Sequence, residues 1–383
     1  MILKKGFSKF IFTIAIVSIL FASSCVDDDP IEPIEINKST KCDTCSIEPT
    51  SYTLKIPPYF NAFVTIPKTP KDNPFTVEGI ELGKKLFYEN KLSINGIISC
   101  SSCHKPDFAF NDLGMALSLG AVGQQGAINA MPLFNLIYAE KYNWNGGANS
   151  LEEQILGPVT HPLEMMETWS NVAQKLQSDP TYVILFKKAF PKEAIDSNTT
   201  VKAIAQFLRT LISSNSPADN EFSAYEGFPV NGRLLTLEER RGFQVFIDPN
   251  GGDCTHCHGD QYNPLWTDFS LSNNGLDALP DSGHAAVTKL ATDVGKFKVP
   301  SLRNLIYTSP YMHDGRFNTL EEVVDFYDQD VEPNSPNISP QMFHRTGANG
   351  HIINLSPQNK RDLVAFLKAL SDPSFVTNPD YRP

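Results

Sequence analysis

The stretch "SCSSCHKPDFAF", residues 99–110, holds two cysteines separated by two residues and followed directly by a histidine. The same pattern returns as "CTHCH" at residues 254–258. It is typical of covalent attachment of a c-type haem, in which both thiols bond the porphyrin and the histidine ligates iron. A shared zinc site is the competing interpretation, because four cysteines and two histidines supply enough tetrahedral ligands. The long separation of the two pairs favours two haems, attached at Cys100, Cys103 and His104 and at Cys254, Cys257 and His258.

The N-terminus has the features of an export signal. Three lysines precede an apolar run at residues 10–21, and small residues lead to Cys25. The run is shorter than the roughly 20 apolar residues that span a bilayer. Because "ASSC" resembles a bacterial lipobox, we predict a lipoprotein signal peptide at 1–24 and an exported protein, periplasmic, outer-membrane or at the cell surface, that is anchored to the membrane by lipid on Cys25. Removal of 1–24 changes the formal net charge from −11 to −14, which argues against nucleic-acid binding.

The segment after Cys25 is predicted to be a flexible tether. Residues 25–55 are rich in Pro, Asp, Glu, Ser and Thr, a composition that does not favour a packed core. Cys42 and Cys45 lie in this segment without a following histidine, so they do not form a third haem site. A local disulfide is the simplest interpretation of this pair, and it agrees with an exported protein.

The rest of the chain repeats one plan around each C-x-x-C-H motif. "GKKLF" (83–87) and "GFQVF" (242–246) precede the motifs, and "FLRTL" (207–211) and "FLKAL" (366–370) follow them. The flanking segments have the apolar periodicity of amphipathic helices. A glycine inside a helix costs about 1 kcal/mol relative to alanine, so the two glycines indicate close helix–helix crossings.

This duplicated plan predicts the fold class. We expect a mainly α protein with two cytochrome c-like haem domains in tandem and few strands. The N-terminal domain is predicted at 56–228 and the C-terminal domain at 229–383, with the boundary near "YEGFPVNGR".

Two further motifs carry a resemblance to a known family. They are "WNGGANSLEEQILGPVTHPLEM" (144–165) and "FKVPSLRNLIYTSPYMHDGRFNTLEEVVDFY" (297–327). Together with the haem motifs, they make residues 56–375 resemble the bacterial di-haem cytochrome c peroxidase family, which includes the MauG-like enzymes. The resemblance implies that the N-terminal haem is the peroxide site and that the C-terminal haem receives or stores electrons.

The ligands of the N-terminal haem follow from this resemblance and from an absence in the sequence. Family members that rest in a six-coordinate state carry a distal histidine after the first motif, but residues 105–143 contain no histidine. We therefore expect a five-coordinate haem on His104 that is open to peroxide. Met115 and Met131 are the alternative sixth ligands.

The resemblance also implies catalytic residues. Glu164 matches the family's acid–base residue, which moves a proton from one peroxide oxygen to the other. Gln154 matches the amide that orients peroxide, and His161 is a further candidate near Glu164. Trp144 matches the tryptophan that relays charge between the haems.

A calcium ion at the domain interface is implied by resemblance alone. Asn129, Thr308 and Pro310 match the positions that hold this ion in the family. An amide oxygen and two backbone carbonyls, completed by waters, are chemically suitable for calcium.

Tyr327 is the predicted outer ligand of the C-terminal haem. "NTLEEVVDFYD" predicts a helix with Thr319 as N-cap and Glu322 completing a capping box, and its apolar face includes Tyr327. By resemblance, Tyr327 occupies the position of the axial methionine of ordinary family peroxidases and of the ligating tyrosine of MauG. Met312 and Met342 are the alternatives.

Three functions remain at this point. The first is a peroxidase that reduces hydrogen peroxide to water with electrons from a small cytochrome c or another periplasmic donor. The second is a MauG-like enzyme that uses peroxide-derived high-valent haem to oxidise Trp or Tyr of a partner protein. The third is a non-catalytic electron carrier, which an open haem beside Glu164 disfavours. A homodimer is compatible with each of them.

Overall fold

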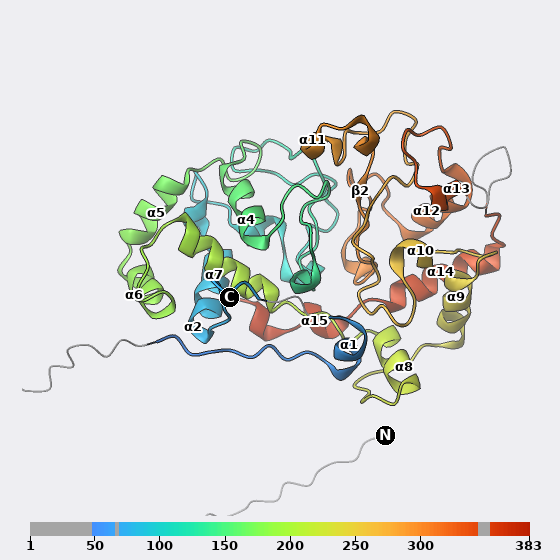
Figure 1. The fold of residues 1–383 in the computed structure, drawn as a ribbon, viewed down its shortest axis with the longest axis horizontal. Helices are drawn as coiled ribbons and strands as arrows, with labels where there is room; N and C mark the ends of the chain where they lie inside the picture. Colours follow the sequence, from blue (N-terminus) through green and yellow to red (C-terminus); the bar gives the residue numbers. More distant parts are fainter. Residues whose placement is uncertain (1–47, 66–68, 344–352) are drawn as a thin grey trace, which may run out of the picture. The chain divides into compact units, whose positions relative to one another are not determined.

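Helices form most of the regular structure of this protein (Figure 1). The computed structural model describes residues 48–65, 69–343 and 353–383. Over these residues the strands are confined to β1 (Leu271–Ser272) and β2 (Phe297–Lys298), which pair antiparallel. The predicted mainly α fold is therefore confirmed. The α-helices are α1 (Pro58–Phe63), α2 (Val77–Phe87), α3 (Cys100–Cys103), α4 (Leu151–Thr160), α5 (Trp169–Gln177), α6 (Pro180–Ala189), α7 (Ser197–Arg209), α8 (Pro217–Tyr225), α9 (Leu237–Ile247), α10 (Thr255–His258), α11 (Ala285–Thr288), α12 (Leu320–Asp325), α13 (Pro340–Phe343), α14 (Pro357–Ala369) and α15 (Pro373–Val376).

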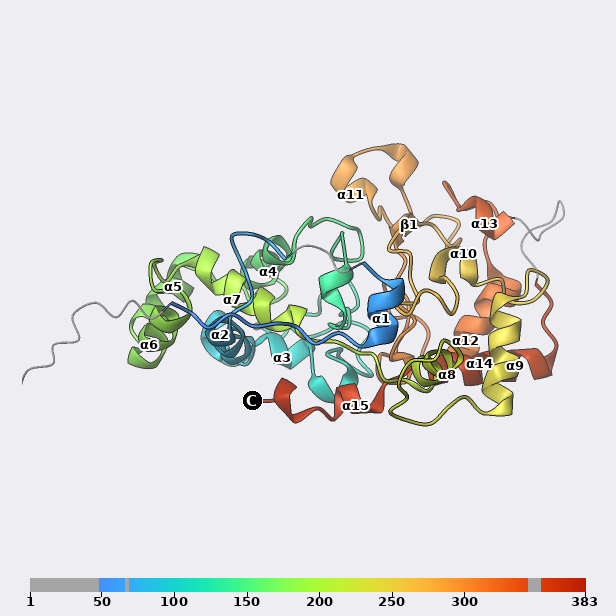
Figure 2. The same cartoon turned by 60° about the horizontal axis from the view of Figure 1, so that its bottom comes forward.

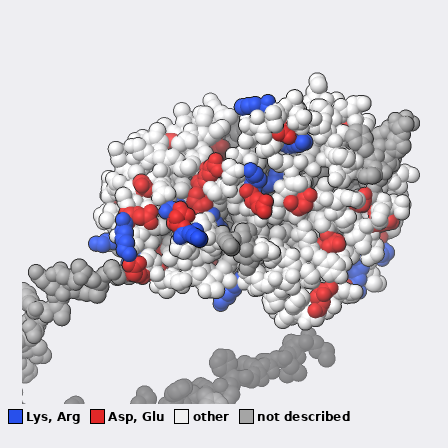
Figure 3. All heavy atoms as spheres, viewed as in Figure 1, with Lys and Arg blue, Asp and Glu red and all other residues white. Residues whose placement is uncertain are grey.

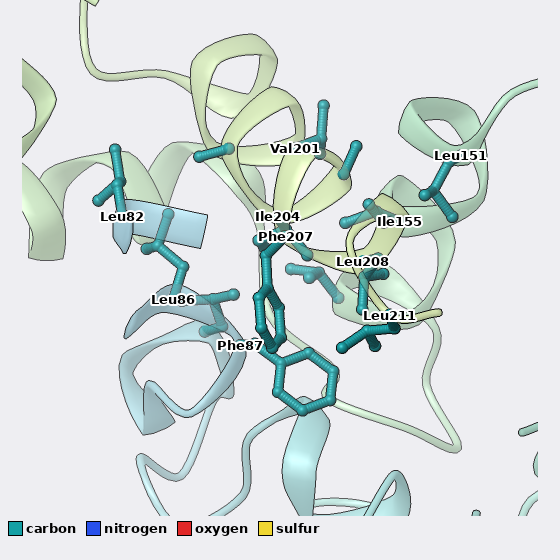
Figure 4. Packing of buried hydrophobic residues seen from close by; sticks show 14 of the residues in the cluster. Leu82, Leu86, Phe87, Leu151, Ile155, Val201, Ile204, Phe207, Leu208 and Leu211 are labelled. Atoms are coloured by element: carbon teal, nitrogen blue, oxygen red, sulfur yellow. The ribbon is translucent and has the colours of Figure 1, made fainter. Parts of the chain in front are cut away.

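The first hydrophobic core lies where α2 crosses α7 (Figure 4). Helix α7 begins with a capping box between Asp196 and Thr199, which satisfies free backbone N–H groups at its start. Gly83 lies at the crossing, where an added Cβ would overlap the Ala203 carbonyl oxygen of α7. The glycine predicted to mark a close approach therefore does so. The side chains at this crossing are Leu82, Leu86 and Phe87 from α2 and Val201, Ile204, Phe207 and Leu208 from α7.

The second hydrophobic core repeats this arrangement with α9 and α14, which lie side by side in Figures 1 and 2. An added Cβ on Gly242 would overlap the Asp362 carbonyl oxygen and press on Phe366. Phe246 and Trp266 pack edge-on against each other and against Phe366. The two cores agree with the predicted pair of cytochrome c-like units.

The first and the last α-helices of the described chain, α1 and α15, each pack in the core of the opposite half. Tyr59 and Phe60 of α1 pack in the second core, although they precede the first haem motif. Phe375 and Val376 of α15 pack in the first core, although they follow the second motif. Core membership also changes between Leu211 and Ala218, ahead of the boundary that the sequence predicted after residue 228.

The N-terminal part of the chain is described only from residue 48. Within the segment predicted as a tether, the backbone N–H of Tyr52 donates to the Phe75 carbonyl, and Thr50 pairs with Glu78. Residues 50–54 thus lie against the folded part of the chain. The predicted signal peptide, Cys25, Cys42 and Cys45 lie outside the described residues.

The described part of the chain contains no helix that is long and apolar enough to cross a membrane. On the face shown in Figure 3, acidic and basic side chains are interspersed. Buried charge is largely paired, as in the ion pair between Arg303 and Asp219 inside the second core region.

Candidate functional site

The first haem motif forms a short helix whose two cysteine thiols are uncharged. Ser99 and Ser102 make a capping box at the start of α3, so the backbone N–H groups beside Cys100 are satisfied. Burial raises the pKa of the Cys100 thiol to about 12, and it also raises the pKa of the Cys103 thiol. Neither thiol forms a disulfide.

His104 follows this helix and is held by a backbone carbonyl. Its Nδ1 lies 2.9 Å from the Phe110 carbonyl oxygen, which can only accept, so Nδ1 carries the proton of the neutral ring. Burial lowers the pKa of His104, and the hydrogen bonds to the Phe110 and Met131 carbonyls oppose this shift. A neutral imidazole oriented by a carbonyl is suited to metal ligation. The Met131 backbone therefore lies beside His104.

The second motif has the same local design. His258 ends α10, and its Nδ1 lies 3.2 Å from the Trp266 carbonyl oxygen. Burial lowers the pKa of His258 to about 4, which keeps the ring neutral. The pKa of the Cys254 thiol is raised to about 12 and that of Cys257 to about 11, again mainly by burial.

The zinc alternative needs cysteines and histidines of both motifs in one cluster. Cys100 packs against the first core and Cys254 against the second. Within residues 48–65, 69–343 and 353–383, no three His, Cys, Asp or Glu side chains converge as a metal site. The arrangement favours a separate group at each motif.

A cavity of about 260 Å³ lies over the second motif and is lined mainly by apolar side chains. It brings together residues that the sequence analysis selected from distant parts of the chain. Those residues are Asn129, Trp144, Cys254, Cys257, His258, Thr308, Pro310, Met312, Tyr327 and Met342.

Tyr327 reaches this cavity from a widened turn. The predicted capping box between Thr319 and Glu322 is present, and α12 then passes into a π-helical turn, η6 (Phe326–Asp330). Such turns are frequent at functional sites because they redirect a side chain. The Nδ2 of Asn274 donates to the Tyr327 hydroxyl at 3.1 Å and lies 3.8 Å from the Met312 sulfur.

The environment of Tyr327 disfavours a free phenolate. Burial raises the pKa of Tyr327 to about 12, and the hydrogen bond from Asn274 acts in the opposite direction. The Asn274 amide lies beside two of the candidate outer ligands, Tyr327 and Met312. The third candidate, Met342, lines the same cavity. Of these three, Tyr327 lies on the segment predicted as a helix, but α12 ends at Asp325 and Tyr327 falls in the π-helical turn that follows.

Trp144 is buried between the two halves of the chain. Its indole Nε1 donates to the Asn129 carbonyl at 2.9 Å, and its own carbonyl accepts from the Lys298 backbone N–H at 2.7 Å. Asn129 in turn donates its backbone N–H to the His313 carbonyl at 2.8 Å. Trp144 is thus fixed to segments of both halves.

The predicted calcium positions lie close to this tryptophan. Asn129 and Thr308 are buried, and the peptide bond before Pro310 is cis. The Nδ2 of Asn129 donates to the carbonyls of Met115 and Ala116, so its Oδ1 is the atom available for a cation. Asn111 lines the same cavity, and its buried Oδ1 has no hydrogen-bond partner.

Gln154 lies on α4, whose buried side chains belong to the first core, and Glu164 follows this helix. Helix α4 begins at the Ser150 cap and carries Gln154 half-buried on its surface. Glu164 follows the helix with 47% of its side chain exposed, and its Oε1 lies 3.5 Å from His161 Nδ1. Partial burial raises the pKa of the Glu164 carboxyl, and His161 opposes the shift.

The loop of Glu164 is held by backbone hydrogen bonds to residues on both sides of the first motif in the sequence. The Glu164 carbonyl accepts from the Ala121 N–H at 2.7 Å, and the Met165 carbonyl accepts from the Ile94 N–H at 3.0 Å. The Glu164 charge contributes to the raised pKa values of Cys100 and Cys103. The carboxyl therefore lies near the first attachment site.

Comparison with known proteins identifies the family. The profile of the di-haem cytochrome c peroxidase family matches residues 77–226. The methylamine utilization protein MauG of Methylorubrum extorquens is 35% identical over 315 residues, covering 81% of this chain and 83% of that protein. The chain belongs to the di-haem cytochrome c peroxidase family. This peroxidase-family chain is also 33% identical over 333 residues to the cytochrome-c peroxidase IdrP1 of a Pseudomonas species, covering 79% of the chain and 83% of that protein.

A solved structure extends the likeness to the fold of this di-haem peroxidase homologue. The crystal structure of a MauG-like protein associated with microbial copper homeostasis matches with a TM-score of 0.73 and 31% identity. The match covers 86% of this chain and 99% of that one. Family membership confirms the predicted family, implies two c-type haems and indicates an oxidoreductase that acts on peroxide.

The sequence analysis missed several residues of the cavity over the second motif. Lys298, Asn274, Asn111 and His313 all line it but were not selected. The only sequence signal for Lys298 was its position between two apolar residues, Phe297 and Val299. The other three become candidates only when the fold brings them to the cavity.

Proposed function

We propose that this chain reduces hydrogen peroxide to water at its N-terminal haem site, with electrons relayed through the C-terminal haem. The observation that carries the proposal is the position of Glu164. Its half-exposed carboxyl lies close enough to the first C-x-x-C-H motif for its charge to raise the pKa of both thiols. Peroxide cleavage requires a proton-transfer group beside an accessible site.

Two covalently bound c-type haems fit the residues at both motifs. Cys100 and Cys103, and likewise Cys254 and Cys257, supply the thiols for thioether bonds, and His104 and His258 supply neutral imidazoles for iron. The apolar cavity over Cys254 and Cys257 suits a porphyrin, and the orphaned Asn111 Oδ1 indicates that a further group completes this site. When bound, the haem supplies a redox-active iron.

The proton in this reaction is handled by Glu164. Its carboxylate accepts a proton from one peroxide oxygen and returns it to the other, so that the departing oxygen leaves as water. Gln154 is half-buried on the surface of α4, and its amide is the group that would orient peroxide. The absence of histidine from residues 105–143 supports a haem on His104 that would remain accessible to peroxide.

Electrons pass between the halves by way of Trp144. Its position in the cavity wall over His258 supports this role, and its hydrogen bonds to both halves fix the ring. A calcium ion held by Asn129 Oδ1 and the Thr308 and Pro310 carbonyls would hold the segments around Trp144 together. Hard cations prefer such neutral oxygen ligands completed by water.

A second function is favoured by Tyr327. Its placement in the C-terminal cavity, with a donor from Asn274 on its hydroxyl, supports a His258–Tyr327 ligand pair. An anionic oxygen ligand stabilises oxidised iron, whereas a methionine raises the reduction potential. The chain would then store oxidising equivalents and use them on Trp or Tyr of a partner protein, as in MauG-like chemistry.

Export and partners complete the proposal. The mature protein is a lipoprotein anchored through Cys25, and its electron donor is a small cytochrome c or another periplasmic carrier. A homodimer is compatible with this arrangement.

An assay of peroxide consumption with a reduced small cytochrome c tests the proposed function. A peroxidase oxidises two donor molecules for each peroxide consumed, because each donor supplies one electron. A MauG-like enzyme instead consumes peroxide with little donor oxidation and accumulates oxidised Trp or Tyr on a partner, detected by mass spectrometry. A protein with two haems that consumes no peroxide in either assay would contradict both functions.

A further inference from the structure

Lys298 is a buried cation that has no anionic partner among the described residues. It belongs to β2, is 6% exposed and lines the cavity over His258. Its Nζ has one hydrogen-bond neighbour in the described part of the chain, the Lys141 carbonyl oxygen at 3.5 Å. This distance is longer than the 2.7–3.2 Å of an ordinary N–H···O hydrogen bond. No carboxylate of the described residues forms an ion pair with it.

The other buried bases show how unusual this is. Among the described residues, four Lys or Arg residues are buried, and three of them have acidic partners. Arg303 pairs with Asp219, Arg209 pairs with Glu152, and Lys202 lies within 4.0 Å of Asp72 and Glu193. Lys298 is the exception.

An unpaired buried ammonium is costly, because the interior does not replace its hydration. Burial lowers the pKa of Lys298 to about 8, so the side chain remains largely protonated at neutral pH. Lys298 therefore presents a positive charge to the cavity, and no carboxylate of the described residues balances it.

We propose that Lys298 binds a propionate carboxylate of the C-terminal haem. The inference rests on the proposed function, because it takes a haem attached to Cys254 and Cys257 as the occupant of this cavity. The two propionates are the anionic groups of that cofactor. A charge-assisted hydrogen bond from Nζ to one of them satisfies the lysine.

The position of Lys298 gives this pair a role in electron transfer. Its backbone N–H donates to the Trp144 carbonyl at 2.7 Å, and its Nζ lies toward the Lys141 carbonyl in the same loop. Residues 142 and 148 close that loop with a β-bridge. Lys298 is thus a positioning residue that connects the acidic edge of the haem to the loop that carries Trp144.

The test is the reduction potential of the C-terminal haem in the two-haem protein. Lys298→Met removes a positive charge near the haem and leaves a propionate unpaired, which disfavours the gain of an electron. We expect the potential to fall by an amount equal to about a tenfold change in the reduction equilibrium, 59 mV for one electron. Lys298→Arg keeps the charge and should restore most of the potential. Lys296→Met, at a partly exposed position paired with Asp293, is the matched control and should leave it unchanged.

The vibrational spectrum of the haem gives a second readout, and it uses a variant that keeps the positive charge at residue 298. In Lys298→Arg, the resonance Raman propionate-bending frequency of the C-terminal haem should shift, because the donor geometry changes. An unchanged frequency in Lys298→Arg, or an unchanged potential in Lys298→Met with both haems bound, overturns the role of Lys298. Fewer than two covalent haems in the unmodified protein would instead overturn the proposed function itself.

Discussion

The two halves of the molecule contain the same segment and use it differently. Asn-Leu-Ile-Tyr occurs at residues 135–138 and again at 304–307. Both asparagines have positive φ, and a short helix follows each of them, η3 (Leu136–Tyr138) and η5 (Leu305–Tyr307). In both copies a tyrosine hydroxyl further along donates back to the leucine carbonyl of that helix. A capped helix then follows, α4 in the first half and α12 in the second.

The side chains on this shared backbone separate the two halves. Counting from the repeated tetrapeptide, Gln154 corresponds to Val323, and Pro158 corresponds to Tyr327. The first copy leads to the half-exposed carboxyl of Glu164, and the second leads into a cavity lined by Val323 and Tyr327. The same backbone plan thus carries a half-exposed carboxyl in the first half and a cavity-lining tyrosine in the second.

The largest expected effect is on peroxide turnover, from a substitution of Glu164 in the first half. Glu164→Gln should lower peroxide turnover roughly 100-fold or more, because the amide cannot accept and return a proton. Both haems and the fold should remain, since Glu164 is half-exposed and makes no buried ion pair.

Glu140→Gln is a suitable control, because Glu140 is an exposed acid outside the Glu164 loop. Steady-state kinetics of both variants with peroxide decide the matter. Near-normal turnover in Glu164→Gln would remove Glu164 from the mechanism and erase this distinction between the halves.

The helix crossings are the feature on which the halves should agree. Gly83→Ala and Gly242→Ala each place a Cβ against a backbone carbonyl, so each should lower the free energy of unfolding by about 1–3 kcal/mol. Gly157→Ala in α4 meets no atom within 4 Å and should instead gain up to about 1 kcal/mol from helix propensity.

Urea unfolding of the three variants measures these changes. A Gly83→Ala protein as stable as Gly157→Ala would show that the α2–α7 crossing is looser than described. A large difference between Gly83→Ala and Gly242→Ala would show that the two crossings are not equivalent.

A smaller effect is expected on the rate of electron transfer between the haems when Trp144 is replaced. Trp144→Phe should slow electron transfer between the haems about tenfold, equivalent to 1.36 kcal/mol of barrier, while peroxide binding stays unchanged. Flash-reduction or stopped-flow spectroscopy at the two haem bands follows this step.

Trp169→Phe is the control. Trp169 packs against the first core, its Nε1 donates to the Leu156 carbonyl, and it does not line the cavity over the second motif. Equal inter-haem rates in the two variants would exclude Trp144 as the relay.

The smallest effect is a pH shift. The pKa of Glu164 is raised by partial burial, so its carboxylate is lost at a higher pH than that of an ordinary glutamate. The rate should therefore fall on acidification as pH passes down through this raised pKa. A pH profile of kcat/KM shows this acid limb, and it should be missing from the residual rate of Glu164→Gln. The same limb in both proteins would assign it to another group.

Local features were predictable from the sequence, because they depend on neighbouring residues. The glycine crossings and the capping box at Thr319 follow from spacing and residue type, and both are present. The two C-x-x-C-H motifs are equally local.

Features that depend on distant contacts were not predictable. The exchange of α1 and α15 between the cores has no signal within either segment, because their apolar side chains fit any core. The π-helical turn at Phe326–Asp330 changes the angular position of Tyr327 without a Gly or Pro to mark it. Lys298 became a candidate only from the fold, which buries its side chain without an acidic partner among the described residues.

Electron paramagnetic resonance of the resting ferric protein tests the central difference between the halves most directly. We predict one high-spin haem, on His104 with its opposite position open, and one low-spin haem, on His258 with Tyr327 as the sixth ligand. Tyr327→Phe should alter the low-spin signal and leave the high-spin signal unchanged, and the near-infrared spectrum should lack a methionine-to-iron band. Two low-spin haems, or a methionine band that survives in Tyr327→Phe, would contradict the account.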